Sequence, residues 1–258
     1  AAPVTLVLRY AARSDRGLVR ANNEDSVYAG ARLLALADGM GGHAAGDIAS
    51  QLVVDTVKVA VQRTDDISLQ LLTESLQQAN DELCHYSARN LQGRTAGSTV
   101  VMLMIDKLHY HFLWAGDSRG YLLRNNVLRQ VTRDHSQVNE MVDEGLIDSS
   151  EAEQHELANV ITRAVGVDPN LTVDVISGVW QPGDLFLLCS DGLNKELSDD
   201  EICHYLTHNN IAEANRALLH STLVAGARDN VTCILIKVDV NSVNVNEKDK
   251  TIPIYIKN

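Results

Sequence analysis

Two amphipathic helices follow each other between two blocks of predicted strands, and this order constrains the fold more than any other feature. Apolar side chains recur at a spacing of about 3.6 residues over positions 45–62. A second apolar stripe begins at Ile67 and ends at Tyr86, and Asp65 and Asp66 before it suit a helix N-terminus. Because no strand separates the two helices, we expect them to form one layer over one sheet.

Short apolar runs on both sides of this helix pair predict strands joined by tight turns. Strands are expected at residues 4–12, 26–28, 32–38, 98–106, 108–115, 121–124, 127–131, 171–179, 184–189 and 230–238. A second helix pair is expected at 198–207 and 211–225. Consecutive strands with tight turns imply antiparallel sheets. Strand blocks that alternate with helix pairs predict an α+β fold of two packed sheets with helices outside.

Two segments differ from this pattern. Residues 135–165 are polar and acidic with short helical fragments, which is typical of an inserted flap and not of core. Residues 241–258 hold a charged turn followed by Ile252-Pro253-Ile254-Tyr255-Ile256, and the sequence gives this tail no role. We therefore expect one catalytic domain at 1–240 and a C-terminal tail at 241–258.

Several apolar strands end on an aspartate. The run before Asp38 is followed by three glycines within four positions, and similar contexts surround Asp117 and Asp191. Asp229 lies at the start of the last predicted strand. Burying an unpaired carboxylate is costly, so each acid is either solvated in a turn or holds a cation. Four such positions are hard to explain as turns alone. Oxygen ligands without a cluster of His or Cys favour Mg²⁺ or Mn²⁺ over Zn²⁺.

Charge and cysteine content exclude several classes of partner. The net charge of −12 disfavours nucleic acid or an anionic membrane, because both require a basic surface. The four cysteines lack metal-ligand spacing, and we expect reduced thiols in a cytoplasmic protein. No apolar run is long enough to span a membrane, and the N-terminus lacks a signal-peptide pattern.

Two alternative functions suggested by short motifs do not fit the sequence. Gly39-x-Gly41-x-x-Ala44 matches a dinucleotide fingerprint, but a second helix follows where that fold needs a parallel strand. A cysteine-based phosphatase needs an arginine six positions after its cysteine. None of the four cysteines has one.

Seven short motifs occur in the order found in the metal-dependent type 2C protein serine/threonine phosphatases, and the chain resembles their bacterial branch. In chain order they are Arg20-x-x-Asn23-Glu24-Asp25, Asp38-Gly39-Met40-Gly41-Gly42, Ser98-Thr99, Gly116-Asp117-Ser118-Arg119, Asp134-His135-Ser136, Ser190-Asp191-Gly192 and Asp229-Asn230-x-Thr232. The resemblance covers about residues 13–238. It implies a four-layer α-β-β-α sandwich of two mainly antiparallel sheets, with a two-metal centre at one end.

The resemblance also implies roles for the residues at the centre. Asp38 resembles the carboxylate that bridges two Mn²⁺ or Mg²⁺ ions, and the Gly39 carbonyl resembles a further ligand. Arg20 resembles the arginine that binds the substrate phosphate.

The other acids resemble ligands of one ion each. Asp191 and Asp229 are similar to ligands of the first ion. Glu24 and Asp25 resemble the acids that hold the second ion, partly through water. Asp117 resembles the acid of a third, weaker metal site.

The implied reaction is hydrolysis of phosphoserine and phosphothreonine in proteins by a metal-activated water. The implied partners are phosphorylated proteins and a cognate serine/threonine kinase, and we expect a monomer. Animal members carry a histidine, taken as the general acid, directly after Asp-Gly. Here that residue is Met40, which cannot donate a proton, so water or His43 has to replace it. The alternative is a regulatory or binding module that keeps the fold without turnover. The presence of every expected acid favours the enzyme.

Overall fold

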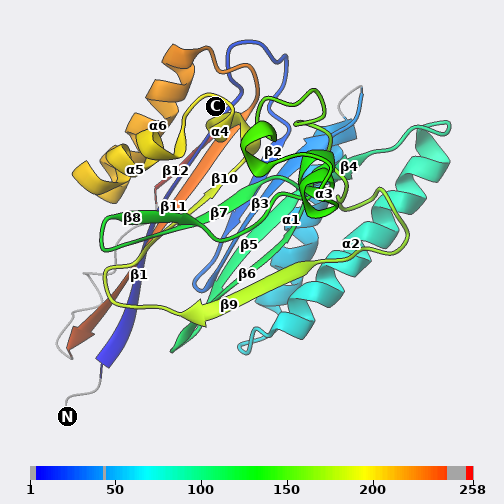
Figure 1. The fold of residues 1–258 in the computed structure, drawn as a ribbon. Coiled ribbons are helices and arrows are strands. Elements are labelled where there is room, and N and C mark those ends of the chain that lie inside the picture. Colours follow the sequence, from blue (N-terminus) through cyan, green and yellow to red (C-terminus); the bar gives the residue numbers. More distant parts are fainter. Residues whose placement is uncertain (1–3, 43–44, 243–253, 258) are drawn as a thin grey trace.

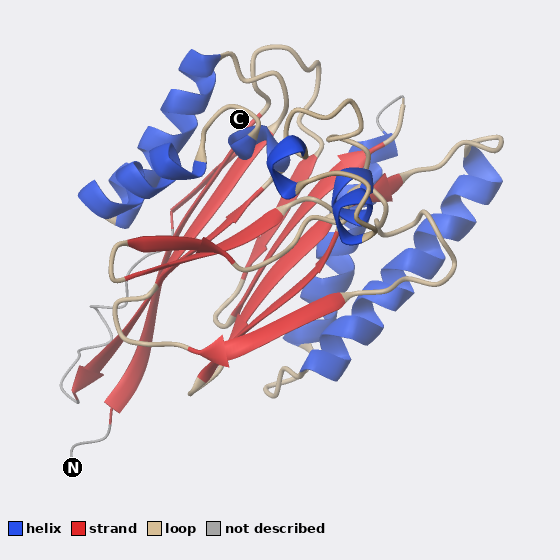
Figure 2. Cartoon of the chain, viewed as in Figure 1, coloured by secondary structure: helices blue, strands red, loops and turns tan. Residues whose placement is uncertain are grey.

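Two six-stranded sheets pack face to face, and a pair of helices covers the outer face of each (Figures 1 and 2). This computed structural model describes residues 4–42, 45–242 and 254–257 of the chain. The layers are helices, sheet, sheet and helices. The α+β, four-layer α-β-β-α sandwich expected from the sequence is therefore confirmed.

The first sheet carries helices α1 and α2. Its strands are β2 (Asp25–Ala29), β3 (Leu33–Met40), β5 (Val100–Ile105), β6 (His109–Ala115) and β9 (Asp174–Val179), in that spatial order, with the short β4 (Gly97–Ser98) paired to β3. All of these pairings are antiparallel. The helices α1 (Ala45–Gln62) and α2 (Leu69–Asn90) pack on its outer face.

The second sheet carries helices α5 (Asp199–His208) and α6 (Ile211–Ala225). Its strands are β12 (Ile254–Lys257), β1 (Val4–Asp15), β11 (Val231–Ser242), β10 (Leu185–Cys189), β7 (Arg119–Arg124) and β8 (Val127–Gln130), in that spatial order. Only β12 runs parallel to its neighbour, β1. The described end of the tail is thus an edge strand of this sheet, while the domain limit at residue 240 stays a prediction.

Side chains alternate between layers along the central strands. In β5, Val100 and Met102 face the helices, whereas Val101 and Leu103 face the other sheet. Along β11, Cys233 and Leu235 likewise face α5 and α6, and their neighbours point into the space between the sheets. Both faces of these strands are buried. If the pairing of a strand shifted by one residue, the side chains that pack on the helices and those that pack between the sheets would change places. The packing therefore fixes where each strand ends.

Several predicted boundaries were wrong. Strand β1 continues to Asp15 and not only to residue 12, and β11 continues to Ser242 and not only to residue 238. Helix α2 begins at Leu69 and not at the two acids before it, because the Ser68 hydroxyl accepts a hydrogen bond from the Leu71 N–H and caps the helix. Strand β9 begins at Asp174 and not at Leu171. Leu171 and Val173 are apolar because they pack, from a loop, against the cluster beneath α1 and α2.

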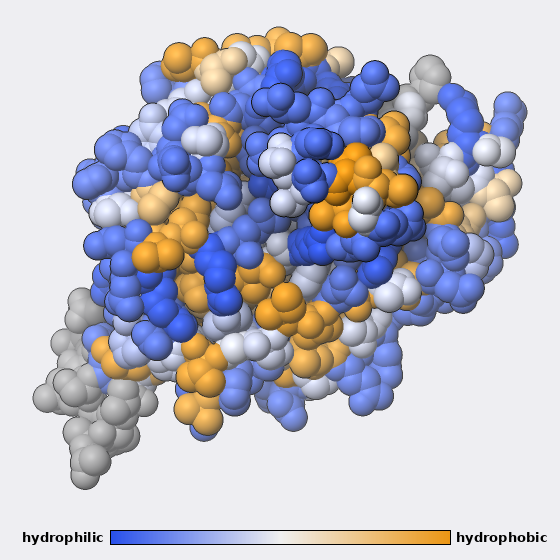
Figure 3. Space-filling model, in the orientation of Figure 1, coloured by the Kyte–Doolittle hydropathy of each residue, from blue (hydrophilic) through white to orange (hydrophobic). Residues whose placement is uncertain are grey.

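The flap crosses the end of the sandwich between β8 and β9. It contains α3 (Gln137–Asp143) and one turn of 3₁₀ helix at Ser149–Glu151. Its exposed apolar side chains include Leu146, Leu157 and Val160. Apolar atoms gather around α3 on the face shown in Figure 3. No described helix has the length and apolar character needed to cross a bilayer.

Candidate metal centre

The acids predicted from the sequence meet at one edge of the sandwich, where strands from both sheets end. Asp38 lies near the C-terminal end of β3, and Asp117 follows β6 in the same sheet. Asp191 follows β10 and begins the short helix α4 (Asp191–Asn194) of the second sheet, and Asp229 precedes β11. Both sheets thus contribute carboxylates to the same cluster at this edge.

A cavity of about 380 Å³ opens between these strand ends. Its lining includes Arg20, Glu24, Asp38, Gly39, Met40, Asp117, Asn159, Ile161, Asp191, Lys195 and Asp229. Asp25 is not among them. It pairs with Asp38 across the β2–β3 ladder and is fully buried behind the cavity, where Thr232 Oγ1 donates to its Oδ2 at 2.7 Å. His43 lies outside the described residues.

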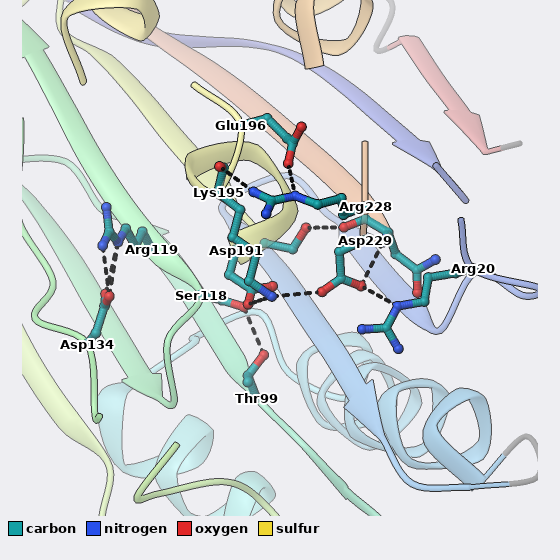
Figure 4. A network of polar contacts seen from close by, with 12 residues as sticks. Arg20, Thr99, Ser118, Arg119, Asp134, Asp191, Lys195, Glu196, Arg228 and Asp229 are labelled. Carbon is teal, nitrogen blue, oxygen red and sulfur yellow. Dashed lines mark hydrogen bonds and ion pairs between the residues drawn. The ribbon is translucent and has the colours of Figure 1, made fainter. Parts of the chain in front are cut away.

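The backbone of Asp38 is held from both sides by Thr99. The Asp38 N–H donates to Thr99 Oγ1 at 3.1 Å, and the Thr99 N–H donates to the Asp38 carbonyl at 2.9 Å. The Thr99 hydroxyl is also hydrogen-bonded to Ser118 Oγ at 2.8 Å (Figure 4). The Ser98-Thr99 and Asp117-Ser118 motifs therefore share one task, which is to fix the end of β3.

Glycines allow α1 to pack directly on this strand end. A Cβ at Gly39 would overlap the carbonyl oxygen of Gly46, and a Cβ at Gly46 would overlap the Glu24 carboxylate. The Gly39 N–H donates to the Glu24 carbonyl at 3.0 Å. Glu24, Gly39 and the first turn of α1 are thus held against one another at van der Waals contact.

The loop that carries Arg20 is tied to β11 by one buried side chain, Asn230. Its Oδ1 accepts from the Glu24 N–H at 3.0 Å, and its Nδ2 donates to the carbonyls of Arg16 and Asn22, each at 2.8 Å. The Arg20 side chain is 58% exposed, and its Nε lies 3.5 Å from Asp229 Oδ1. An exposed guanidinium on an anchored loop is therefore present at the rim of the cavity.

Lys195 is a member of the site that the sequence reasoning missed. Its Nζ lies 2.8 Å from Asp191 Oδ2 and 3.0 Å from Asp229 Oδ2 (Figure 4). The spacing of four residues from Asp191 places both side chains on one face of a helix, and this was the available signal. Within the described part of the chain, no group of three His, Cys, Asp or Glu side chains is arranged as a preformed metal-binding site. Asp191 and Asp229 are instead drawn together around a lysine ammonium.

The electrostatics of the cluster favour a bound cation. Burial, with a contribution from Asp191, raises the pKa of Asp25 to about 7, although hydrogen bonds from Thr232 and Ser190 oppose this shift. Burial and the nearby carboxylates, first Asp25 and then Asp191, raise the pKa of Asp38 well above its usual range. The pKa of Asp117 is raised well above its usual range too, first by burial and then by Asp191. Dications at this place would favour the ionised form of each acid.

Two buried acceptors also fit a hard cation. Oδ1 of Asp117 and Oδ1 of Asp191 have no hydrogen-bond partner among the described residues. Buried carboxylate oxygens without a donor are costly, and oxygen atoms are the ligands that Mg²⁺ and Mn²⁺ prefer. The residues present therefore fit such ions.

Three further motif residues support the site from outside the cavity. Arg119 forms a two-pronged ion pair with Asp134, through Nε at 3.0 Å and Nη2 at 2.9 Å. His135 Nδ1 accepts from the Gly116 N–H at 3.0 Å, and its Nε2 lies 2.7 Å from Asp174 Oδ2. Because Nδ1 is the acceptor, Nε2 carries the proton that is donated to Asp174. His135 thus joins the turn before Asp117 to the start of β9.

Comparisons with known proteins found a family model and relatives that match most of this chain. The family model described as protein phosphatase 2C matches residues 19–225. The serine/threonine protein phosphatase PstP of Mycobacterium tuberculosis is 44% identical over 245 residues, which are 92% of this chain and 46% of that protein. The serine/threonine phosphatase stp of Listeria monocytogenes is 34% identical over 240 residues, which are 88% of this chain and 95% of that protein. The chain thus spans about half the length of its mycobacterial relative.

Solved structures extend the likeness to the whole fold. The crystal structure of Mycobacterium tuberculosis PstP/Ppp superposes with a TM-score of 0.85 at 41% identity, covering 90% of this chain and 99% of that one. A crystal structure of the PstP catalytic domain in complex with two manganese ions gives a TM-score of 0.82 at 42% identity, covering 91% and 100%.

Proposed function

The chain belongs to the protein phosphatase 2C family, and from this premise we propose that it hydrolyses phosphoserine and phosphothreonine in proteins at a binuclear Mn²⁺ or Mg²⁺ centre. The observation that carries the proposal is the convergence of acids from the ends of both sheets on one cavity, with an arginine at its rim. The manganese-bound PstP catalytic domain supports the choice of metal.

In this proposal each acid near the cavity has a part in holding metal. Asp38 would hold both ions, and the Gly39 carbonyl would be a further ligand. Asp191 and Asp229 hold the first ion through the same side chains that now contact Lys195.

The second and third ions involve the remaining acids. Glu24 lines the cavity and would hold the second ion, whereas Asp25, which pairs with Asp38 across the β2–β3 ladder, would contribute through water. Asp117, with its unpartnered Oδ1, holds a third and weaker ion.

The chain's own residues then bind and orient the phosphate. When bound, divalent cations lower the pKa of a water molecule toward about 7 and withdraw charge from phosphoryl oxygens. Arg20 offers paired N–H donors to two phosphoryl oxygens, a geometry that a guanidinium matches well. Met40 lines the cavity but has no proton to give, so the leaving oxygen takes its proton from water or from His43. Asn159 and Ile161 of the flap line the cavity, so we expect the flap to contact the substrate.

The decisive experiment compares Asp38→Asn with Asp55→Asn on phosphothreonine and phosphotyrosine peptides. Asp55 is an exposed aspartate on α1 and serves as the matched control. We expect phosphate release from phosphothreonine that needs Mn²⁺ and stops in EDTA. Even supporting residues around a metal cost 10–100-fold when replaced, so Asp38→Asn should lose at least about 100-fold in activity. Activity that survives EDTA, or an Asp38→Asn variant as active as Asp55→Asn, contradicts the proposal.

We also propose a cytoplasmic monomer that opposes a cognate serine/threonine kinase. The four cysteines are all free thiols, which supports a reducing compartment. The relatives named as serine/threonine phosphatases support phosphorylated proteins as partners. Light scattering of the purified protein tests the monomer, and a measured mass of two or more chains contradicts it.

A further inference from the structure

Lys195 occupies an unusual position for a lysine, because its ammonium lies inside the acidic cluster. The side chain is only 25% exposed, and the two carboxylates that it contacts are 11% and 14% exposed. Among the described residues, Lys195 is the only one with which Asp191 forms an ion pair. The pairing is therefore part of the cavity wall and not a solvated surface contact.

The backbone holds Lys195 in this place. Its N–H donates to the Asp191 carbonyl at 2.9 Å, which closes the single turn of α4. Its own carbonyl accepts from Arg228 Nη2 at 3.1 Å, while Arg228 Nε is paired with Glu196 Oε1 at 2.7 Å (Figure 4). Arg228 is thus committed elsewhere. Lys195 contacts both aspartates, whereas Arg20 approaches only Asp229.

We propose that Lys195 is a built-in counter-cation that holds Asp191 and Asp229 together in the metal-free protein and competes with the divalent ion that binds them. The inference rests on the metal-binding roles proposed above for these two acids. The ammonium uses Oδ2 of both carboxylates, and a divalent ion needs lone pairs of the same groups. A dication held by the same two carboxylates would repel the ammonium, so we expect Lys195 to move away from them when metal binds.

The lysine side chain suits such an exchange. Its flexible four-carbon stem lets the ammonium leave without moving the helix turn that carries it. The competition has two consequences for the metal-free protein. The paired aspartates remain charge-compensated, and the affinity for the metal is lower than the same carboxylates would give without the lysine.

Isothermal titration of EDTA-stripped protein with Mn²⁺ tests this competition. Lys195→Met keeps the length of the side chain and removes its charge. We expect the Kd for Mn²⁺ to tighten about tenfold, which corresponds to about 1.4 kcal/mol. Lys195→Arg keeps the charge and should bind within about threefold of the wild type. Lys58→Met makes the same chemical change at an exposed position of α1 and should leave the Kd unchanged.

Thermal unfolding separates competition from a purely structural role. Without metal, Lys195→Met should melt below the wild type, because two facing carboxylates lose their cation. With saturating Mn²⁺ it should melt at the same temperature or higher. Equal destabilisation in both conditions overturns the inference. If Lys195→Met does not fold, Lys195→Gln takes its place in both assays.

Two additional variants separate this inference from the proposed function. Asp191→Asn and Asp229→Asn should each weaken Mn²⁺ binding strongly. If they do, and Lys195→Met binds Mn²⁺ no more tightly than wild type, the role of Lys195 is wrong and the metal centre stands. If neither asparagine variant changes Mn²⁺ binding, the proposed metal centre itself is wrong, and the inference fails with it.

Discussion

Replacing Asn230 with alanine removes three hydrogen bonds that join the Arg20 loop to the start of β11. A hydrogen bond between neutral groups contributes about 0.5–1.5 kcal/mol net, so the three together amount to about 1.5–4.5 kcal/mol. Water can reach the Arg16 and Asn22 carbonyls once the loop opens, because the loop is largely exposed. We therefore expect Asn230→Ala to lose about 2 kcal/mol of unfolding free energy and to raise KM, since Arg20 and Glu24 lose their anchor.

Asn230→Asp should be more harmful than Asn230→Ala, although it preserves the shape of the side chain. A carboxylate oxygen would replace Nδ2 and face two carbonyl oxygens, each 2.8 Å from the original nitrogen. Two donors are thereby exchanged for two repulsive contacts, and a negative charge is added beside Asp229. This order of severity distinguishes hydrogen bonding from simple loss of volume.

Asn215 on α6 provides the matched control. Its Nδ2 donates to the carbonyls of Ala11 and Cys233, at 2.8 and 3.1 Å, within the sheet and away from the cavity. Asn215→Ala should lose stability in urea denaturation without changing KM for a phosphothreonine peptide. A wild-type KM in Asn230→Ala, or an equal rise in KM for Asn215→Ala, would refute the reasoning.

Two other predictions concern charge at the site. Arg20→Ala should raise KM more than it lowers kcat in steady-state kinetics, because the guanidinium binds phosphate in both the ground state and the transition state; an unchanged KM would remove Arg20 from this role. Burial raises the pKa of Asp25 to about 7, whereas an unfolded carboxyl titrates near 3.9, so the metal-free folded protein holds an extra proton between these values. Its unfolding free energy in EDTA should therefore fall as pH rises from about 4 to about 7, by at most about 1.4 kcal/mol per pH unit from this group. Asp25→Asn should remove that part of the slope in denaturation curves measured at pH 5 and pH 7, and stability that increases over this range in the wild type would contradict the assignment.

The sequence predicted the layers because packing imposes a period that can be counted. Strand β5 is apolar at every position because both of its faces are buried, and α1 carries an apolar stripe because only one face is. The start of α2 could not be predicted from charge, since acids and a capping serine are both typical of helix N-termini and only the Ser68 hydrogen bond decides between them. Strand β12 pairs with β1, which lies near the other end of the sequence, and no local pattern indicates such a distant partner.

The candidate site shows the same division. The acids at strand ends were predictable, because an apolar run that stops at an aspartate is a local signal. Glu24 and Asp25 resembled two ligands of one ion, but consecutive side chains at the start of a strand point to opposite sides. Glu24 therefore faces the cavity and Asp25 lies behind it. Lys195 was missed because its spacing of four residues from Asp191 is informative only within a helix, and a helix of one turn is too short to be predicted from the sequence.

The placement of the carboxylates at strand ends has a consequence for how such an enzyme can diversify. Each acid sits within two residues of a strand whose register is fixed by side chains buried on both faces. The segment between β8 and β9 contributes Asn159 and Ile161 to the cavity wall but none of the proposed ligands. Insertions or deletions in that segment would reshape what reaches the cavity while the positions of the carboxylates stay the same. We therefore expect substrate preference to change with the length of this loop, whereas the positions of the carboxylates depend on the architecture of the sheets.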